Sequence, residues 1–275
     1  MKVVRAKHAG VCYGVERALD MAVAAMLDED STYTLGPLIH NPRVVRDLES
    51  RGVRAVESID DIDEGIVIIR SHGVEPQVVD DLKARGLTVV DATCPHVAKA
   101  QRAAEELREM GCKVLVVGRA EHPEVRGLCG HAGPDAVVVS GADAIPDDLG
   151  DKVGVIVQTT ESKEKLDAVV DALCARGIEP VVKNTICFAT RQRQDSAAAL
   201  AEEVDAIVVI GGKNSSNTTH LYDICKAHCD RSYFVEYPEE IESGWFEGCS
   251  TVGVTAGAST PDNQIAAVVD ILESL

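Results

Sequence analysis

Short runs of Val, Ile, Leu and Ala alternate with longer amphipathic stretches along most of the chain. Such alternation predicts strands and helices in turn. Helical periodicity is clearest at 96–110, 163–176, 190–203 and 262–274. Because a helix that crosses back over a sheet joins parallel strands, we expect mostly parallel sheets. The predicted strands are the apolar runs at 2–6, 32–36, 53–57, 66–70, 87–91, 113–118, 136–140, 153–157, 180–183, 206–211, 232–236 and 251–255.

These runs form three groups of four, which indicates a weak internal repeat. The third run of each group is followed by an acidic stretch and an isoleucine, in SIDDI, SGADAI and YPEEI. We therefore predict an α/β fold of three pseudo-symmetric lobes, each with a small parallel sheet and flanking helices. The predicted lobes are residues 1–94, 95–186 and 187–275.

Polar side chains follow the second and fourth strand of each group. The second strands run into GPLIHN, GRAEHPE and GGKNSSN, and the fourth into RSHG, QTT and TAGAST. In parallel α/β sheets, ligands bind beyond the carboxyl ends of the strands. The pattern predicts one central cavity that all three lobes share.

Three cysteines, Cys12, Cys94 and Cys187, recur at matching places in the repeat. Each ends an apolar run and precedes a predicted helix, and a polar residue (His40, His122 or Ser215) follows 28 residues later. Electron-transfer clusters usually take four cysteines, so three suggest an iron–sulfur cluster with one iron open to a substrate. A zinc site with three cysteines and a histidine, or three buried thiols, are the alternatives.

Histidines and hydroxyl side chains at the strand ends are candidate donors to an anion. Imidazole N–H groups can donate, and a turn at a helix start offers further N–H groups. Each serine could instead be an N-cap, a role that is compatible with anion binding. These candidates are His40, His72, His122, Ser215, Ser216, Asn217 and Ser259.

Glu124 is the best acid–base candidate. It lies two residues after His122, beyond a proline that stiffens the turn. In a closed cavity its carboxyl could keep a raised pKa and donate a proton, whereas a solvated surface carboxylate is the common alternative. Thr159 in the QTT motif could relay protons or orient a substrate hydroxyl.

Composition narrows the class of protein. The chain has 275 residues, 45% of them hydrophobic, which is ample for a buried core. Its net charge of −18 argues against nucleic-acid or anionic-membrane binding and means that an anionic substrate needs local donors. No apolar run reaches the roughly 18 residues of a membrane span, and the N-terminal residues lack the apolar segment of a signal peptide. We expect a cytoplasmic protein without a disulfide framework, since its nine cysteines are widely spaced.

Taken together, the motifs GVCYGVERAL, LGPLIHNP, RSHGV, DATCPHVAKAQ, HPEVRG, QTT, CFATRQRQ, GGKNSSNT and TAGASTP closely resemble the 4-hydroxy-3-methylbut-2-enyl diphosphate reductase family. The resemblance runs the length of the chain. It implies a three-lobed trefoil around one 4Fe–4S cluster and a reaction of the methylerythritol phosphate route to isoprenoids.

The resemblance also implies roles for the candidate residues. Cys12, Cys94 and Cys187 would hold the cluster, Glu124 would donate a proton, and Thr159 would lie beside the substrate hydroxyl. The diphosphate would be held by His40, His72, His122, Ser215, Ser216, Asn217 and Ser259. An external one-electron donor of ferredoxin or flavodoxin type would be needed, because no flavin or NAD motif is present.

Two other functions remain open at this point. A three-cysteine dehydratase of quinolinate synthase type would act on carboxylates, whereas the SSN and TAGAST motifs favour a diphosphate. A non-catalytic iron–sulfur or zinc redox sensor would leave Glu124 and the histidines without a role.

Overall fold

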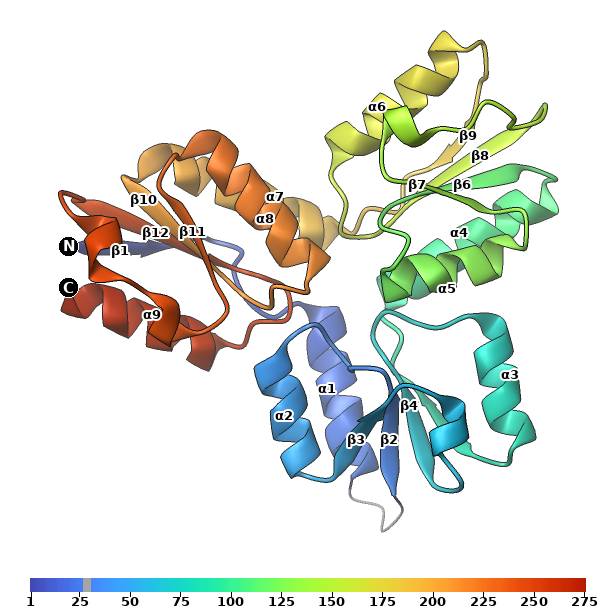
Figure 1. Ribbon diagram of the computed structural model, residues 1–275, viewed down its shortest axis with the longest axis horizontal. Helices are drawn as coiled ribbons and strands as arrows, with labels where there is room; N and C mark the ends of the chain where they lie inside the picture. The colour runs from blue at the N-terminus through green and yellow to red at the C-terminus, as the bar shows by residue number, and fades with distance from the viewer. Residues whose placement is uncertain (27–30) are drawn as a thin grey trace. The chain divides into compact units, whose positions relative to one another are not determined.

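The computed structural model describes residues 1–26 and 31–275, and within them the strands form three four-stranded sheets. Every strand pairing in these sheets is parallel, which confirms the predicted α/β class (Figure 1). The chain divides into two compact units. The first contains Met1–Val15, His40–Arg43 and Phe188–Leu275, and the second contains Glu16–Ile39 and Val44–Cys187.

The first unit is built on a sheet in the order β1-β12-β10-β11. Strand β10 alternates its side chains between two cores: Ile207 and Val209 pack with helices α7 and α8, and Val208 and Ile210 pack with α9. Both faces of the sheet are therefore covered, as parallel sheets require. The elements are β1 (Lys2–Arg5), α7 (Phe188–Glu203), β10 (Ala206–Ile210), α8 (Ser216–His228), β11 (Ser232–Val235), η3 (Pro238–Glu240), η4 (Ser243–Phe246), β12 (Thr251–Ala256) and α9 (Asp262–Ser274).

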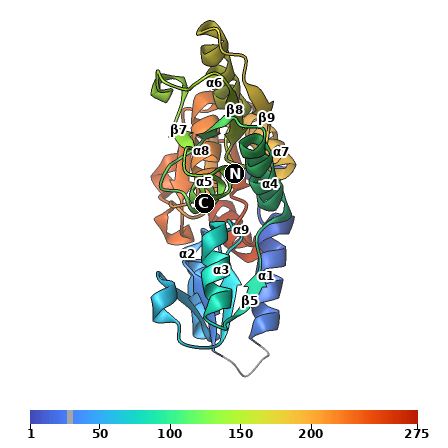
Figure 2. The same ribbon diagram turned by 90° about the vertical axis from the view of Figure 1, so that its right-hand side faces the viewer.

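The second unit contains two sheets. In one, the order is β3-β2-β4-β5, and helix α3 lies beside β5 (Figure 2). Its elements are α1 (Tyr13–Ala25), β2 (Thr32–Leu35), α2 (Pro42–Ser50), β3 (Val53–Val56), η1 (Ile59–Asp61), β4 (Ile66–Ile69), α3 (Pro76–Ala84) and β5 (Thr88–Asp91). The first residues of α1 and α2, up to Val15 and Arg43, belong to the first unit.

The other sheet has the order β7-β6-β8-β9. Val114 and Val116 face α4 and α5, while Leu115 and Val117 face α6, so this sheet is also covered on both sides. Its elements are α4 (Pro95–Glu109), β6 (Lys113–Val117), α5 (Pro123–Ala132), β7 (Val137–Val139), η2 (Ala142–Ala144), β8 (Val153–Val157), α6 (Lys163–Ala175) and β9 (Val181–Lys183).

The first strand of each predicted group of four pairs outside that group: β1 with β12, β5 with β4 and β9 with β8. The strand expected at 2–6 was placed in the lobe 1–94, but β1 pairs with β12, from Lys2 opposite Thr251 to Arg5 opposite Val254. The order of elements along the chain does not determine which edge of a sheet a strand joins, since parallel neighbours are connected by crossovers, and these can include most of the chain. The boundaries at 94 and 186 stay a prediction.

Among the helices of residues 1–26 and 31–275, none is both long enough and apolar enough to span a bilayer.

Candidate active site

The three predicted cluster cysteines hold equivalent positions in their local structures. Each directly precedes a helix, since α1, α4 and α7 begin at the next residue. Each backbone N–H donates to a carbonyl two residues beyond the end of the neighbouring strand. Cys12 donates to Ala258 after β12 (3.1 Å), Cys94 to Ser71 after β4 (3.0 Å) and Cys187 to Thr159 after β8 (3.0 Å).

This geometry makes the cysteines plausible metal ligands. All three are half-buried. The N–H groups at the start of a helix favour a negative charge such as a metal-bound thiolate. In contrast, Cys225, outside the repeat positions, is fully buried, and burial raises its pKa to about 12, with nearby Cys229 adding to the effect. A thiol of this kind is inert.

Two of the predicted anion donors, His72 and His122, lie together in the second unit. Their ring centroids are 5.5 Å apart in an edge-to-face arrangement. His72 lies in the turn after β4, where Gly73 has a φ of +71° and a Cβ would collide with the Gln101 side chain. Only glycine suits that position, so the sharp turn that presents His72 follows from the sequence.

His122 is the N-cap of α5. Its Nδ1 accepts a hydrogen bond from the backbone N–H of Glu124 at 3.2 Å. A neutral imidazole that accepts at Nδ1 carries its proton on Nε2. His122 can therefore present an N–H donor to an anion without being charged.

Glu124 is buried, with 2% of its surface exposed. Its Oε1 accepts from the backbone N–H of Thr159 at 2.6 Å, and its Oε2 accepts from the Thr159 hydroxyl at 2.9 Å. Burial raises the pKa of Glu124 to about 7, and the charge of Glu161 acts in the same direction, while both Thr159 hydrogen bonds oppose the rise. A carboxyl with this pKa can act as an acid near neutral pH.

The first unit holds a polar helix start formed by Ser215, Ser216 and Asn217. Ser215 is the N-cap of α8, and its hydroxyl accepts from the backbone N–H of Thr218 at 3.3 Å. Ser216 and Asn217, 1% and 4% exposed, follow in the first helical turn. The alternative N-cap role is therefore real for Ser215, and this role is compatible with anion binding at the same helix start.

Asn217 carries the strongest sign of a missing ligand. Neither amide atom of its side chain has a hydrogen-bond partner within residues 1–26 and 31–275, and the same is true of the Thr218 and Thr255 hydroxyls. A buried polar group without a partner is destabilising by about 1–3 kcal/mol. A polar ligand at this helix start would satisfy these groups.

Ser259 already uses its hydroxyl proton. Its Oγ donates to the carbonyl of His40 at 2.9 Å. A hydroxyl has one proton, so Ser259 can donate to an anion only after it turns away from His40. Asn41, which the sequence reasoning missed, donates to the Ser259 carbonyl at 2.8 Å and to Gln264 at 3.1 Å. The available signal was an amide in the motif that also contains His40.

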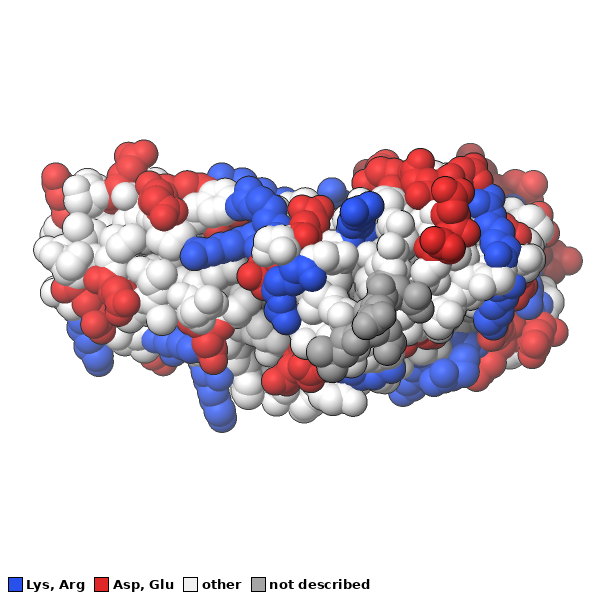
Figure 3. Space-filling view, turned by 90° about the horizontal axis from the view of Figure 1, so that it is seen from below, with Lys and Arg blue, Asp and Glu red and all other residues white. Residues whose placement is uncertain are grey.

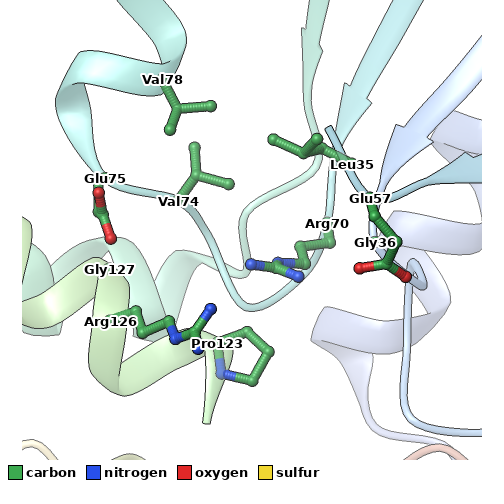
Figure 4. A pocket seen from close by; sticks show the side chains of 10 residues that line it. All are labelled: Leu35, Gly36, Glu57, Arg70, Val74, Glu75, Val78, Pro123, Arg126 and Gly127. Atoms are coloured by element: carbon green, nitrogen blue, oxygen red, sulfur yellow. The ribbon is translucent and has the colours of Figure 1, made fainter. Parts of the chain in front are cut away.

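The second unit also contains a cavity of about 200 Å³. Pro123 lines this cavity, but its neighbours His122 and Glu124 do not. It is lined by the guanidinium groups of Arg70 and Arg126 and by the carboxylates of Glu57 and Glu75 (Figure 4). Burial, and next the charge of Arg126, lower the pKa of Arg70. Since two negative groups balance the two positive ones, this cavity has no preference for an anion, and we do not assign the substrate to it.

The fold and these residues define a class: a parallel α/β protein with thiols at helix starts, a buried acid and a polar helix start next to an unpartnered buried amide. The model of the LytB protein family matches residues 3–273. The chain therefore belongs to the LytB family, which confirms the family resemblance of its motifs.

Named relatives agree with this assignment. The 4-hydroxy-3-methylbut-2-enyl diphosphate reductase of Geobacter sulfurreducens is 48% identical over 274 residues, which is 99% of this chain and 97% of the relative. The enzyme of the same name from Pelobacter propionicus is 48% identical over 262 residues, with 95% and 94% covered.

Solved structures agree as well. A structure of (E)-4-hydroxy-3-methyl-but-2-enyl diphosphate reductase, described as the terminal enzyme of the non-mevalonate pathway, matches with a TM-score of 0.72 at 41% identity, and each chain is fully covered. The Plasmodium falciparum E-1-hydroxy-2-methyl-but-2-enyl-4-diphosphate reductase matches with a TM-score of 0.91 at 24% identity, with 98% of this chain and 87% of the other covered. The second match supports the fold alone.

Proposed function

We propose that this chain is an oxidoreductase that converts 4-hydroxy-3-methylbut-2-enyl diphosphate into isopentenyl and dimethylallyl diphosphate. The relatives that carry this name match it over nearly their whole length. The observation that carries the proposal is Glu124, a buried acid with a pKa of about 7 that is hydrogen-bonded to Thr159. The reaction consumes two electrons and two protons and releases the hydroxyl oxygen as water.

The proposed cofactor is one 4Fe–4S cluster held by Cys12, Cys94 and Cys187. These cysteines share one local geometry, which supports the proposal. Each directly precedes a helix, and its backbone N–H donates to a carbonyl in the loop after the neighbouring strand. Three thiols suit a cluster in which one iron has no protein thiolate. When bound, the cluster supplies single electrons and a Lewis-acidic iron.

The proposed donors to the diphosphate are each supported by their own local surroundings. In the first unit, the start of α8 offers N–H groups next to the unpartnered amide of Asn217. In the second, His122 presents its Nε2–H. The net charge of −18 makes such local donors necessary for an anionic substrate. The full proposed set is His40, His72, His122, Ser215, Ser216, Asn217 and Ser259.

Glu124 and Thr159 are the proposed proton donors. When Glu124 is ionised, the Thr159 hydroxyl donates to its Oε2 at 2.9 Å. When Glu124 is protonated, this hydrogen bond can reverse, so that Oε2–H donates to Thr159 Oγ. The threonine proton is then released to the leaving hydroxyl of the substrate, and Glu124 replaces it. Thr159 thus positions the acid and relays its proton.

The electrons come from outside the chain in this proposal. No flavin or NAD motif is present in the sequence, so a one-electron carrier of ferredoxin or flavodoxin type is expected. The cytoplasmic location stays a prediction.

An anaerobic assay tests the activity. Protein with its cluster intact is incubated with the hydroxymethylbutenyl diphosphate and reduced methyl viologen, and the C5 products are quantified. Glu124→Gln should lower turnover at least about tenfold, within the usual range for a lost general acid, and leave the iron content unchanged. Glu121→Gln, an exposed carboxylate of the same turn, is the matched control and should retain full turnover. Failure of the wild type to form either product would reject the activity, and full turnover of Glu124→Gln would reject the role of the acid.

A further inference from the structure

Two aromatic side chains are much more exposed to solvent than the others. Aromatic residues make up only 3% of the chain. Within the described residues, Tyr13 and Phe188 are the exposed ones, at 67% and 65%. Each directly follows a cysteine that we propose as a cluster ligand, Cys12 or Cys187. Large aromatic side chains that are exposed to solvent next to the proposed cluster ligands indicate a surface to which another molecule binds.

Tyr13 and Phe188 lie on backbone segments that one side chain joins. Arg193, which is 5% exposed, donates from Nη1 to the Ala189 carbonyl at 3.1 Å and from Nη2 to the Gly10 carbonyl at 2.7 Å. Ala189 follows Phe188, and Gly10 comes three residues before Tyr13. A single buried guanidinium therefore joins the backbone just before Tyr13 to the backbone just after Phe188, within the first unit.

A positive charge accompanies these aromatic residues. Arg191 is exposed in the first turn of α7, and that turn contains no acidic residue. A cation at a helix start opposes the helix dipole, so its position is not explained by helix stability. Since the whole chain carries a net charge of −18, an exposed arginine here offers local attraction to an acidic partner.

We propose that Tyr13, Phe188 and Arg191 form the docking surface for the one-electron carrier protein that reduces the cluster. This inference rests on the proposed function, which requires electrons from outside the chain. Aromatic residues and arginine are the side chains that anchor protein interfaces. A carrier seated on this surface contacts the residues next to two of the three proposed cluster ligands.

The chemistry of the partner follows from the same residues. It is a small protein with a one-electron redox centre near its surface, an apolar contact area and acidic groups opposite Arg191. Redox encounters bury less than about 1,200 Å² in total, so two aromatic anchors and one charge are enough to define such a surface. In each encounter the carrier loses one electron and the cluster gains it. Two encounters and two protons complete one turnover.

The test compares a protein donor with a small one. Initial rates of the Tyr13→Ser/Phe188→Ser double variant are measured with a reduced bacterial ferredoxin and, separately, with reduced methyl viologen. We expect the KM for ferredoxin to rise at least about fivefold, as for the loss of interface anchors. Turnover with viologen and the iron content should equal those of the wild type. Met110→Ser, which removes another exposed apolar side chain (44%), is the control and should change neither rate.

The outcomes separate this proposal from the proposed function. An unchanged KM for ferredoxin in the double variant overturns the docking surface, whereas absence of wild-type turnover with viologen rejects the activity itself. Arg191→Gln, which leaves both aromatic residues in place, is a second test should the double variant lose iron. It should raise the KM for ferredoxin at low ionic strength and weaken its dependence on salt. If the double variant loses iron and Arg191→Gln has the KM and the salt dependence of the wild type, the docking surface is overturned.

Discussion

At the scale of single residues, Glu124 combines two opposing influences. Its burial favours the neutral acid, whereas the N–H and hydroxyl of Thr159 favour the carboxylate. The balance leaves the pKa of Glu124 at about 7, so both protonation states are populated under ordinary conditions. A residue that must give up a proton and recover it in every turnover needs this property.

The raised pKa makes the stability of the protein depend on pH. An unfolded glutamate has its ordinary pKa of 4.5, and the folded value is about 7. The stabilisation from the neutral acid is therefore complete below pH 4.5 and is lost as the pH rises through 7. Glu124→Gln removes this dependence. The free energy of unfolding of the variant minus that of the wild type should be about 2 kcal/mol larger at pH 8 than at pH 5, measured by denaturant titration without substrate. If this difference is equal at the two pH values, Glu124 does not have the raised pKa.

The sequence could predict the place of Glu124 in the chain but not its burial. The motif puts it two residues after His122, where a solvated carboxylate remained an alternative. What excludes that alternative is the packing of α5 and the contact with Thr159, 35 residues further on. Likewise, no local pattern could predict that the Ser259 hydroxyl donates its hydrogen bond to the carbonyl of His40, which lies 219 positions away in the chain.

At the scale of elements, the same connection recurs three times. After a strand at the edge of a parallel sheet, the chain reaches a cysteine directly before the next helix, and the N–H of that cysteine donates to the loop after the adjacent strand. The internal repeat could predict the strands and the cysteines, because period and composition are local signals. It could not predict that β1 would join β12, because pairing across most of the chain has no local signal.

The loop after β12 approaches α8 so closely that Gly257 is required there. A Cβ at this position would collide with the Thr218 side chain. Gly257→Ala should therefore force the loop away from α8 and lower the free energy of unfolding by about 1–3 kcal/mol, the usual effect of overpacking. Thermal unfolding measures the change. Gly244→Ala, where a Cβ meets nothing within 4 Å, is the control. Equal melting temperatures for Gly257→Ala and wild type would show that the loop can adjust.

At the scale of the whole molecule, charge limits what can bind. Asp and Glu outnumber Lys and Arg by 45 to 27, and the face drawn in Figure 3 shows both kinds of side chain interspersed. The overall field repels anions, so the proposed binding of a diphosphate depends on the few donors named above. Composition could predict this requirement, and which strand ends meet it stays a prediction.

A substitution series tests the proposed cluster ligands. Cys12→Ser, Cys94→Ser and Cys187→Ser should each lose most of the iron and sulfide after anaerobic purification, because a cluster with two protein thiolates is held weakly. Cys174→Ser, which changes an exposed thiol outside the repeat positions, should keep the full content. Metal analysis per chain measures the effect. Wild-type iron content in any of the three ligand variants would remove that residue from the cluster.

The pairing of β1 with β12 also affects how the protein matures. Cys12 leaves the ribosome well before its backbone partner, Ala258, which lies 246 residues later in the chain. Until translation has passed that point, the nascent polypeptide has no β12 for its first strand to join and no loop to hold Cys12 in place. Assembly of the proposed cluster is therefore expected to follow synthesis of β12 and its loop, and a product that ends before β12 should fail to retain the cluster.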